Sequence, residues 1–381
     1  MRVGIMGGTL DPVHSGHVLV ARKAKELLKL DSVMLLPAGD PPHKAPPTPK
    51  EDRMEMARLA ASECEGLFAC AVEIDRGGVT YTVDTLGELT RANPDTEWFY
   101  LIGADTLDVL DSWRSFGEVA KLCTFAVNGR ADEDVDMERV RAFEAQYGAK
   151  FAILPFNGPE ISSTDVRERV AKGQSIFDLV PEPVERYIRE RGLYMCGKSK
   201  AQVLDILKSE LKPGRYIHTL GVAETAMRLA PRYGVDPRRA ELAGLLHDCA
   251  KSMPIEALRE LARENVPDAD AEELAAERVV HAPAGSVVAA KRFGVKDPAI
   301  LSAIRKHTLG GAEMSAMDAL IYVADFIEPN RSDFPGLSEA RALAETDIFA
   351  AAKQCARLTD EHVRSQGGRS HPRTLAMLRD I

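Results

Sequence analysis

The chain has 381 residues and a formal net charge of −9, which arises from 49 basic and 58 acidic side chains. A chain of this length exceeds one ordinary hydrophobic core, so two domains are expected. The acidic excess lies within residues 1–196. Neither half offers the strongly basic face of a nucleic-acid-binding protein, and small anionic substrates would have to be held by local donors and metal ions.

The cysteine pattern and the apolar segments indicate the cellular compartment of the protein. The six cysteines are scattered and form no CxxC pair, which favours a reducing compartment over a disulfide framework. The first residues lack a signal-peptide pattern, and no run of about 18 apolar residues is present. We therefore expect a cytoplasmic protein with no membrane segment. The sequence leaves homo-oligomerisation open.

A glycine turn follows the first apolar run. Residues 3–6 predict a strand, Gly7 and Gly8 a turn, and the following residues the start of a helix. Glycines let backbone N–H groups approach a phosphate, and a helix N-terminus adds donors and partial positive charge. His14 and His17 are three residues apart, so both imidazoles can face one ligand from the first helical turn. The pattern predicts an anion-binding cradle.

Helical and strand patterns alternate after this cradle. Helices are expected at 18–30 and 51–62 and from residues 80 and 161 onward, and strands at 32–37, 68–74, 99–102 and 123–127. This order favours a Rossmann-like, doubly wound α/β fold with a parallel sheet, in which ligands bind at the carboxyl ends of the strands. A proline-rich loop at residues 40–49 lies at one such end.

Five segments of this half resemble the nicotinate-nucleotide adenylyltransferases of the nucleotidyltransferase superfamily. They are GGTLDPVHSGH at 7–17, PPHK at 41–44, TYTVDTL at 80–86, GAD at 103–105 followed by Trp113, and ISSTDVR at 161–167. The resemblance covers about residues 1–195. It implies transfer of AMP from ATP to nicotinate mononucleotide, with Mg²⁺ bridging the phosphates. The residues alone do not separate nicotinate from nicotinamide mononucleotide.

The same resemblance assigns roles to individual residues. It implies catalytic roles for His14, His17, Lys44 and Arg167, and acceptor binding by Thr82, Asp84 and Trp113. The residues expected to bind ATP are Gly7, Gly8, Thr9, His14, His17, Gly103, Asp105, Ile161, Ser162, Ser163, Thr164 and Arg167.

The second half, residues 197–381, begins with a short polar linker and then reads as helices. Their expected positions are 201–211, 216–233, 237–249, 254–264, 285–293, 298–306, 316–327 and 338–361. This pattern predicts an all-α domain. The expected domains are therefore 1–196 and 197–381.

Histidines and carboxylates interrupt these otherwise apolar helices. The set comprises His218, His247, Asp248, His281, His307 and Asp325. Such groups need partners when buried, and they are ligands that suit Fe, Mn, Co or Zn. Their order resembles the HD superfamily of phosphohydrolases, and more closely its symmetrical diadenosine-tetraphosphatase branch. The resemblance implies one or two metal ions, with iron expected first, around a bridging Asp248.

Three hypotheses follow for the whole chain. We favour an adenylyltransferase fused to a hydrolase that cleaves diadenosine tetraphosphate to two ADP. The second hypothesis makes the helical half a nucleotide-sensing module without turnover. In the third, the first half uses another acceptor and the second half is a phosphodiesterase of other specificity. Lys251, Arg305 and Arg331 either bind phosphate or are surface residues.

Overall fold

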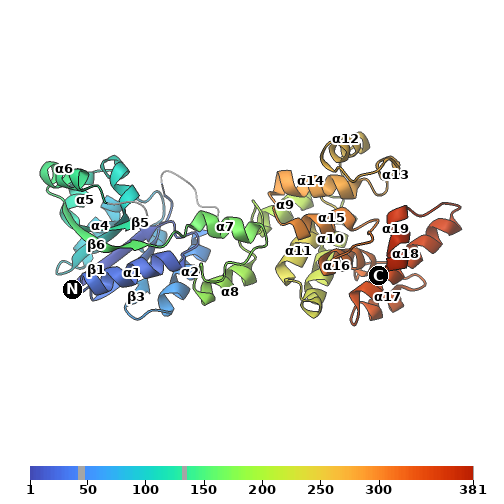
Figure 1. Cartoon of the computed structure of the whole chain (residues 1–381), viewed down its shortest axis with the longest axis horizontal. Helices are drawn as coiled ribbons and strands as arrows, with labels where there is room; N and C mark the ends of the chain where they lie inside the picture. The colour runs from blue at the N-terminus through green and yellow to red at the C-terminus, as the bar shows by residue number, and fades with distance from the viewer. Residues whose placement is uncertain (42–47, 131–134, 381) are drawn as a thin grey trace. The chain divides into compact units, whose positions relative to one another are not determined.

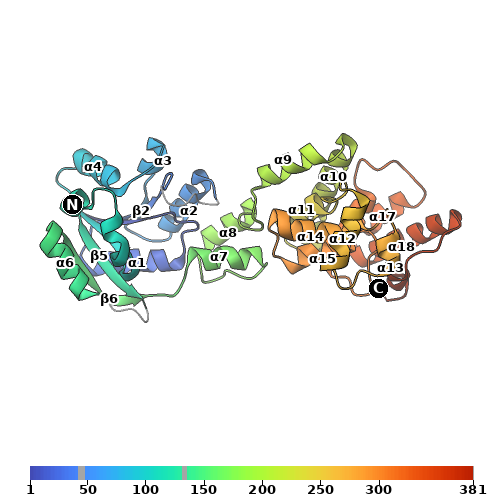
Figure 2. The same ribbon diagram turned by 90° about the horizontal axis from the view of Figure 1, so that it is seen from above.

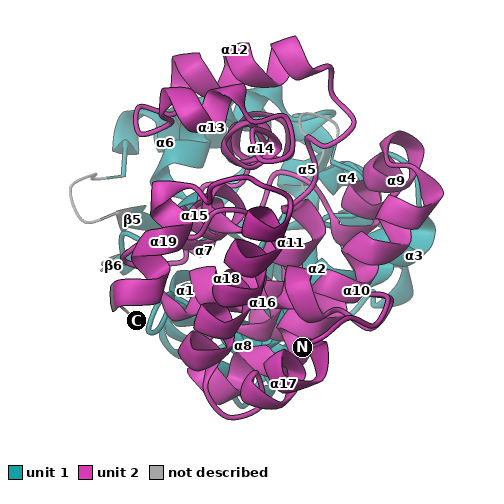
Figure 3. Cartoon of the chain, turned by 90° about the vertical axis from the view of Figure 1, so that its right-hand side faces the viewer, with its two compact units in different colours: residues 1–169, 175–188 teal, residues 170–174, 189–381 magenta. Residues whose placement is uncertain are grey.

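The computed structural model describes residues 1–41, 48–130 and 135–380. They form two compact units, one of residues 1–169 and 175–188 and the other of residues 170–174 and 189–381, as coloured in Figure 3. The sequence predicts a domain boundary between residues 196 and 197, and the division into these two domains remains a prediction. No helix among the described residues is long and apolar enough to cross a membrane.

The first unit is built on a six-stranded parallel sheet with the order β3-β2-β1-β4-β5-β6. The strands are β1 (Arg2–Gly8), β2 (Ser32–Pro37), β3 (Leu67–Ala69), β4 (Glu97–Gly103), β5 (Thr124–Arg130) and β6 (Lys150–Gly158). In the sheet, β2 and β3 lie on one side of β1, whereas β4, β5 and β6 lie on its other side. The carboxyl ends of β1 and β4 therefore flank the switch point where α/β sheets bind ligands.

Helices cover both faces of this sheet. They are α1 (Ser15–Leu27), α2 (Lys50–Ser62), α3 (Val72–Arg76), α4 (Thr82–Ala92), η1 (Ala104–Ser112), α5 (Phe116–Leu122), α6 (Met137–Tyr147), α7 (Ser163–Ala171) and α8 (Glu182–Arg191). Figure 1 shows α1 and α2 on one face and α4, α5 and α6 on the other. This arrangement confirms the expected doubly wound α/β fold.

One expected strand is mostly wrong. The apolar run at 68–74 forms a strand only at Leu67–Ala69, and α3 follows it. The chain turns because Glu73 directs its carboxylate inward, where it accepts hydrogen bonds from the Gly39 N–H and the Thr85 hydroxyl. A short apolar run does not by itself distinguish a strand from a helical turn.

The second unit contains helices and no strand among its described residues, which confirms the expected all-α domain (Figure 2). The helices are α9 (Lys200–Glu210), α10 (Pro213–Leu229), η2 (Ala230–Tyr233), α11 (Pro237–Leu246), α12 (Ile255–Asn265), α13 (Ala271–Ala275), α14 (His281–Phe293), α15 (Pro298–Lys306), α16 (Ala316–Ile327), α17 (Leu337–Leu343), α18 (Ile348–Ser365) and α19 (Pro372–Asp380).

The single helix expected at 338–361 is instead two helices, α17 and α18. Asp347 breaks the run, because its carboxylate accepts hydrogen bonds from the N–H groups of Phe349 and Ala350 and so caps α18. The Tyr233 hydroxyl donates to the Ala344 carbonyl at the break. Apolar spacing continues through the cap, so periodicity alone does not show the break.

Helices α10 and α11 approach each other closely near the expected metal ligands. An ideal Cβ on Gly244 would lie 2.7 Å from the Ala223 Cα, so only glycine allows this distance. The contact brings His218 of α10 and His247 at the end of α11 together, with ring centroids 5.4 Å apart.

Candidate active sites

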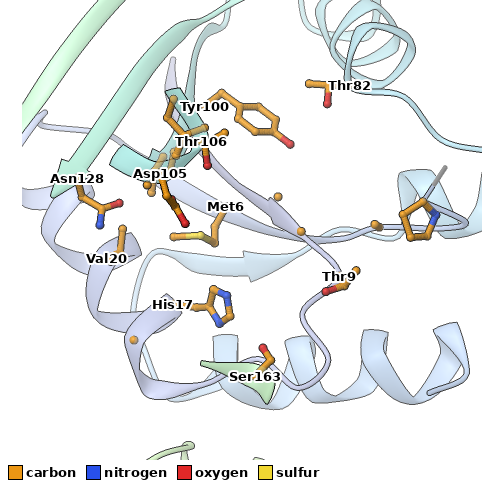
Figure 4. A pocket seen from close by; sticks show the side chains of 18 of the residues that line it. Met6, Thr9, His17, Val20, Thr82, Tyr100, Asp105, Thr106, Asn128 and Ser163 are labelled. Carbon is orange, nitrogen blue, oxygen red and sulfur yellow. The ribbon is translucent and has the colours of Figure 1, made fainter. Parts of the chain in front are cut away.

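A cavity of about 620 Å³ opens at the carboxyl ends of β1 and β4 in the first unit. Its walls come from the glycine turn after β1, the starts of α1, α4 and α7, and the segment after β4. Figure 4 shows Thr82 and Tyr100 on one side of the cavity and His17 with Ser163 on the other. The cavity therefore joins the segments singled out in the sequence.

His14 and His17 form a reciprocal cap at the start of α1. The His14 N–H donates to His17 Nδ1 over 3.2 Å, and the His17 N–H donates to His14 Nδ1 over 3.4 Å. A neutral ring whose Nδ1 accepts a hydrogen bond carries its own proton on Nε2. Burial, and then the adjacent His14, lower the pKa of His17 well below the ordinary 6.5. His17 is therefore neutral at pH 7 and keeps an Nε2–H donor for a ligand.

Arg53 holds the loops that follow β1 and β2, although its side chain is only 1% exposed. Its guanidinium donates to the carbonyls of Thr9, Ala38 and Gly39, and Nε donates to the Thr48 carbonyl. A buried cation with this many backbone partners is a positioning residue for the cradle. No sequence motif marks this role.

The start of α7 supplies part of the opposite wall. Ser162 accepts a hydrogen bond from the Asp165 N–H as a helix cap, and the Ser163 hydroxyl donates to the Pro12 carbonyl over 2.8 Å. Both serines and Ile161 line the cavity. Arg167 instead donates to the Asp11 carbonyl and to Thr164 Oγ1. In this structure Arg167 and Thr164 tie α7 to the cradle, and their predicted roles toward ATP remain predictions.

The other end of the cavity contains aromatic side chains. Trp113 lies edge-on to Tyr100, with ring centroids 5.7 Å apart, and the guanidinium of Arg114 lies 4.5 Å from the centroid of Tyr81. All four residues line the cavity, as does Thr82. The flat side chains and the cation make this end suitable for an anionic aromatic ring.

Asp84 is not among the described lining residues of the cavity, and its expected role toward the acceptor remains a prediction. Its side chain is exposed. The reason is helical geometry, because residues two apart on α4 point in different directions. Lys44 falls outside the described residues. Gly103 and Asp105 both line the cavity as expected.

Few acidic or basic side chains are among the described lining residues of the cavity. Glu73 and Asp105 line it, whereas Arg114 is the one arginine or lysine among its described lining residues. Sequence reasoning missed Arg114, although its position next to Trp113 was a usable signal. It also missed Glu73, because the run that contains it was interpreted as a strand.

The second unit gathers all six predicted metal ligands in one cluster. Three overlapping groups have ligand atoms within 4.8 Å of one another; they are His218–His247–Asp248, His247–His307–Asp325 and Asp248–His281–His307. Asp248 Oδ1 lies 3.0 Å from His281 Nε2 and 3.7 Å from His307 Nε2. Asp248 thus occupies the middle of the cluster.

Backbone carbonyls fix the orientation of two of these histidines. His247 Nδ1 lies 2.7 Å from the Gly244 carbonyl, and His307 Nδ1 lies 2.7 Å from the Ile304 carbonyl. Each Nδ1 therefore donates and each Nε2 faces the cluster, which is the usual arrangement for a metal ligand. His247 Nε2 is buried without a hydrogen bond of acceptable geometry to any described residue. A metal ion would satisfy this nitrogen.

Glu328 orients a third histidine. Its Oε1 lies 3.2 Å from His218 Nδ1, and its Oε2 accepts from the backbone N–H and the side-chain amide of Asn330. An ideal Cβ on Gly221 would lie 2.5 Å from the same Oε2, so the glycine leaves room for the carboxylate. Sequence reasoning missed Glu328, three residues after Asp325.

The two carboxylates of the cluster are ionised. Burial alone would raise the pKa of Asp248, but His247, and then His281 and His307, hold that pKa well below its ordinary value. Burial opposes ionisation of Asp325 too, yet His218 and the neighbouring imidazoles lower its pKa strongly. Two carboxylates among four imidazoles form a donor set that fits a divalent transition metal.

The structure distinguishes among the basic residues for which the sequence allowed either phosphate binding or a surface position. Arg305 forms a buried ion pair with Glu273 and does not line the cluster's cavity, so it is structural. Lys251 lies 3.8 Å from Asp248 Oδ1, and Arg331 lies 2.8 Å from Asp325 Oδ1. Arg215, missed from the sequence, lies 2.8 Å from Asp248 Oδ2. These last three cations line a cavity of about 710 Å³ beside the cluster.

Comparisons with known proteins define the class and then the family. Residues 5–169 match the cytidylyltransferase-like family model, and residues 215–330 match the HD domain model. The chain is thus a nucleotidyltransferase fold joined to an HD domain. It is 43% identical over 197 residues to a probable nicotinate-nucleotide adenylyltransferase of Synechococcus, covering 51% of this chain and 95% of the relative. The chain belongs to the nicotinate-nucleotide adenylyltransferase family.

Two further proteins match different shares of the chain. A Mycoplasma genitalium protein named probable nicotinate-nucleotide adenylyltransferase/Ap4A hydrolase is 28% identical over 331 residues, covering 87% of this chain and 88% of that protein. A Clostridium acetobutylicum structure described as a predicted HD superfamily hydrolase involved in NAD metabolism is 37% identical. It covers 47% of this chain and 95% of that chain, with a TM-score of 0.45. The match to the first of these extends over parts of both units.

Proposed function

We propose that the first unit transfers AMP from ATP to nicotinate mononucleotide, giving nicotinate adenine dinucleotide and pyrophosphate. An oxygen of the acceptor phosphate attacks the α-phosphorus of ATP, and the bond from that phosphorus to the bridging oxygen of pyrophosphate breaks. The observation that carries this proposal is the cradle, where reciprocally capped histidines line a cavity at the switch point of the sheet. Family membership supports the same reaction.

The cradle residues stabilise charge and form no covalent intermediate. The Nε2–H groups of His14 and His17 are placed to donate to phosphate oxygens on which negative charge builds up. Backbone N–H groups of the glycine turn and the start of α1 add further donors. Mg²⁺, which this family implies, would neutralise part of the charge on the phosphates when bound.

The aromatic end of the cavity holds the acceptor in this proposal. Trp113 stacks on the pyridine ring, and Thr82 lines the same cavity. Arg114 places its guanidinium at the same end and pairs with the ring carboxylate of nicotinate. The neutral carboxamide of nicotinamide would gain much less from this cation, so the site favours the acid.

For the second unit, we propose hydrolysis of diadenosine tetraphosphate to two ADP. His218, His247, Asp248 and Asp325 would hold one metal ion, and His281 and His307 would complete a second site that shares Asp248. Iron is our first expectation, followed by Mn, Co or Zn. The metal, when bound, would lower the pKa of a water molecule to supply the nucleophile. Arg215, Lys251 and Arg331 hold the phosphate chain.

Two alternatives make different predictions. A sensing module would bind the dinucleotide without turnover, but the cluster has a complete donor set together with three cations lining one adjacent cavity, as a hydrolase needs. An acceptor whose ring substituent is uncharged would lack the charge that Arg114 matches in this proposal.

Product analysis of the full chain tests both proposals. The protein, loaded with Mn²⁺ or Fe²⁺ and supplied with Mg²⁺, is incubated with ATP and either mononucleotide, and separately with diadenosine tetraphosphate. With nicotinate mononucleotide we expect nicotinate adenine dinucleotide plus pyrophosphate. With diadenosine tetraphosphate we expect ADP alone. ATP plus AMP from the dinucleotide would refute symmetrical cleavage, and binding without any product would support the sensing alternative.

A further inference from the structure

A second cavity of about 410 Å³ lies next to the metal-ligand cluster. Its lining includes Gly214 at the start of α10, and Asn330, Ser332 and Phe334 from the segment after α16. We call this the His218 cavity, because His218 lines it. Its volume falls within the roughly 300–1,000 Å³ typical of small-molecule sites.

The His218 cavity and the larger cavity meet at two arginines. Arg215 and Arg331 line both, while Asp248, His281, His307 and Asp325 line only the larger one. His218, which lies 3.0 Å from Asp325, lines only the smaller. The cluster therefore borders both cavities, and both arginines can contact a phosphate chain that runs from one cavity to the other.

An aromatic pair links the two cavities. Phe334 lines the His218 cavity and Phe326 lines the larger one, with ring centroids 5.3 Å apart and edge-to-face geometry. Phe334 is half-buried, so part of its ring is available to a ligand. A ring beside polar side chains suits a nucleoside, because bases bind by stacking and by hydrogen bonds at their edges.

We propose that the His218 cavity binds the second nucleoside of a dinucleoside polyphosphate. The first nucleoside occupies the larger cavity, the phosphate chain crosses the cluster along Arg215 and Arg331, and the second nucleoside reaches Phe334. This inference rests on the proposed hydrolase function. It explains why these two cavities share Arg215 and Arg331.

Gly214 offers a way to fill this cavity without disturbing the cluster. An ideal Cβ on Gly214 has no heavy atom within 4 Å, and Gly214 itself lines the cavity, so Gly214→Trp can be accommodated at its edge. Gly311→Trp is a matched control, because its Cβ also meets open space and Gly311 lines neither cavity. Ser332→Trp repeats the test from another segment.

The experiment compares diadenosine tetraphosphate with adenosine 5′-tetraphosphate, which has the same phosphate chain and one nucleoside. Metal content and both kcat/KM values are measured for the wild-type chain and each variant. We expect Gly214→Trp and Ser332→Trp to lower the dinucleotide-to-mononucleotide kcat/KM ratio at least tenfold, with unchanged metal content. The Gly311→Trp ratio should equal that of the wild type.

Other outcomes separate the failure of this inference from that of the proposed function. An unchanged ratio, or equal losses on both compounds, would overturn the nucleoside site. A wild-type chain that cleaves neither compound would refute the hydrolase, and binding of a methylene-bridged dinucleotide analogue then tests the site. Weaker analogue binding in Gly214→Trp, with unchanged binding of adenosine tetraphosphate, would support it, and equal binding by wild type and variant would overturn it.

Discussion

His14 and His17 each accept, at Nδ1, a hydrogen bond from the backbone N–H of the other. This exchange does two things at once. It caps two N–H groups at the start of α1, and it sets the neutral tautomer of both rings so that Nε2 carries the proton. The three-residue spacing of the pair is therefore required for the cap as well as for ligand binding.

Replacing His17 by alanine should stop adenylyl transfer. The variant loses one preorganised donor to developing charge, which typically costs roughly 100- to 1,000-fold in rate. It also loses part of the helix cap, so folding is checked by circular dichroism. Hydrolysis by the second unit should continue, and His362→Ala, which alters an exposed histidine of α18, serves as control. A folded His17→Ala protein with the wild-type rate of pyrophosphate release would contradict the assignment.

The lowered pKa of His17 predicts a pH-dependent stability. Folded His17 resists protonation, whereas the unfolded residue takes up a proton near pH 6.5. The unfolded state then binds more protons, so the free energy of unfolding falls as the pH drops below about 6.5. Both tryptophans, Trp98 and Trp113, lie in the first unit, so their fluorescence reports its urea midpoint alone. Between pH 7.5 and 5.5 this midpoint should fall less in His17→Gln than in the wild type; equal falls would exclude His17 as the cause.

Replacing Arg53 by methionine should destabilise the first unit and weaken ATP binding. The change leaves buried backbone carbonyls without donors, and we expect a loss of about 2–4 kcal/mol in the free energy of unfolding. Tryptophan fluorescence in urea measures this loss, and the KM for ATP should rise because the cradle loops lose their anchor. Arg58→Met alters an exposed arginine of the same helix and should change neither quantity. Equal stability of Arg53→Met and Arg58→Met would show that the buried hydrogen bonds are replaceable.

Arg114 should decide which acceptor is preferred. We expect Arg114→Gln to lower kcat/KM for nicotinate mononucleotide by about tenfold or more, since a charge-assisted pair is lost, and to leave nicotinamide mononucleotide nearly unaffected. Arg141→Gln, at an exposed position on α6, is the control. A similar loss with both acceptors would instead assign Arg114 to their shared phosphate.

Asp248 should be needed for metal binding in the second unit. Asp248→Asn keeps the size of the side chain but removes the charge that offsets two dications, so at least one ion should be lost. Metal analysis and hydrolysis of diadenosine tetraphosphate should both show the loss, while pyrophosphate release by the first unit continues. Unchanged metal stoichiometry with full hydrolysis would disprove the bridging role.

The sequence predicted the parts of the molecule in which one physical signal dominates. The buried strands of the sheet and the helical second half follow apolar periodicity, and β2 has the predicted bounds Ser32–Pro37. The polar residues within apolar helices predicted the cluster, because such groups require partners. The conformation of residues 68–74 and the break between α17 and α18 were mispredicted. Side chains distant in sequence decide the first, and the local helix cap at Asp347 decides the second.

Supporting residues of the sites escaped prediction for a related reason. Arg53 contacts carbonyls up to 44 residues away, and Glu328 contacts His218 across 110 residues. Neither pairing leaves a local pattern in the chain. Arg305 shows the converse, because a basic residue close to His307 turned out to be paired with Glu273.

We propose that one chain carries two chemistries, one in each unit. Phosphorus NMR of the metal-loaded full chain tests it most directly, with ATP and nicotinate mononucleotide in one sample and diadenosine tetraphosphate in another. We expect resonances of pyrophosphate and nicotinate adenine dinucleotide in the first sample and of ADP alone in the second. An unchanged spectrum in either sample, or ATP and AMP in the second, would contradict it.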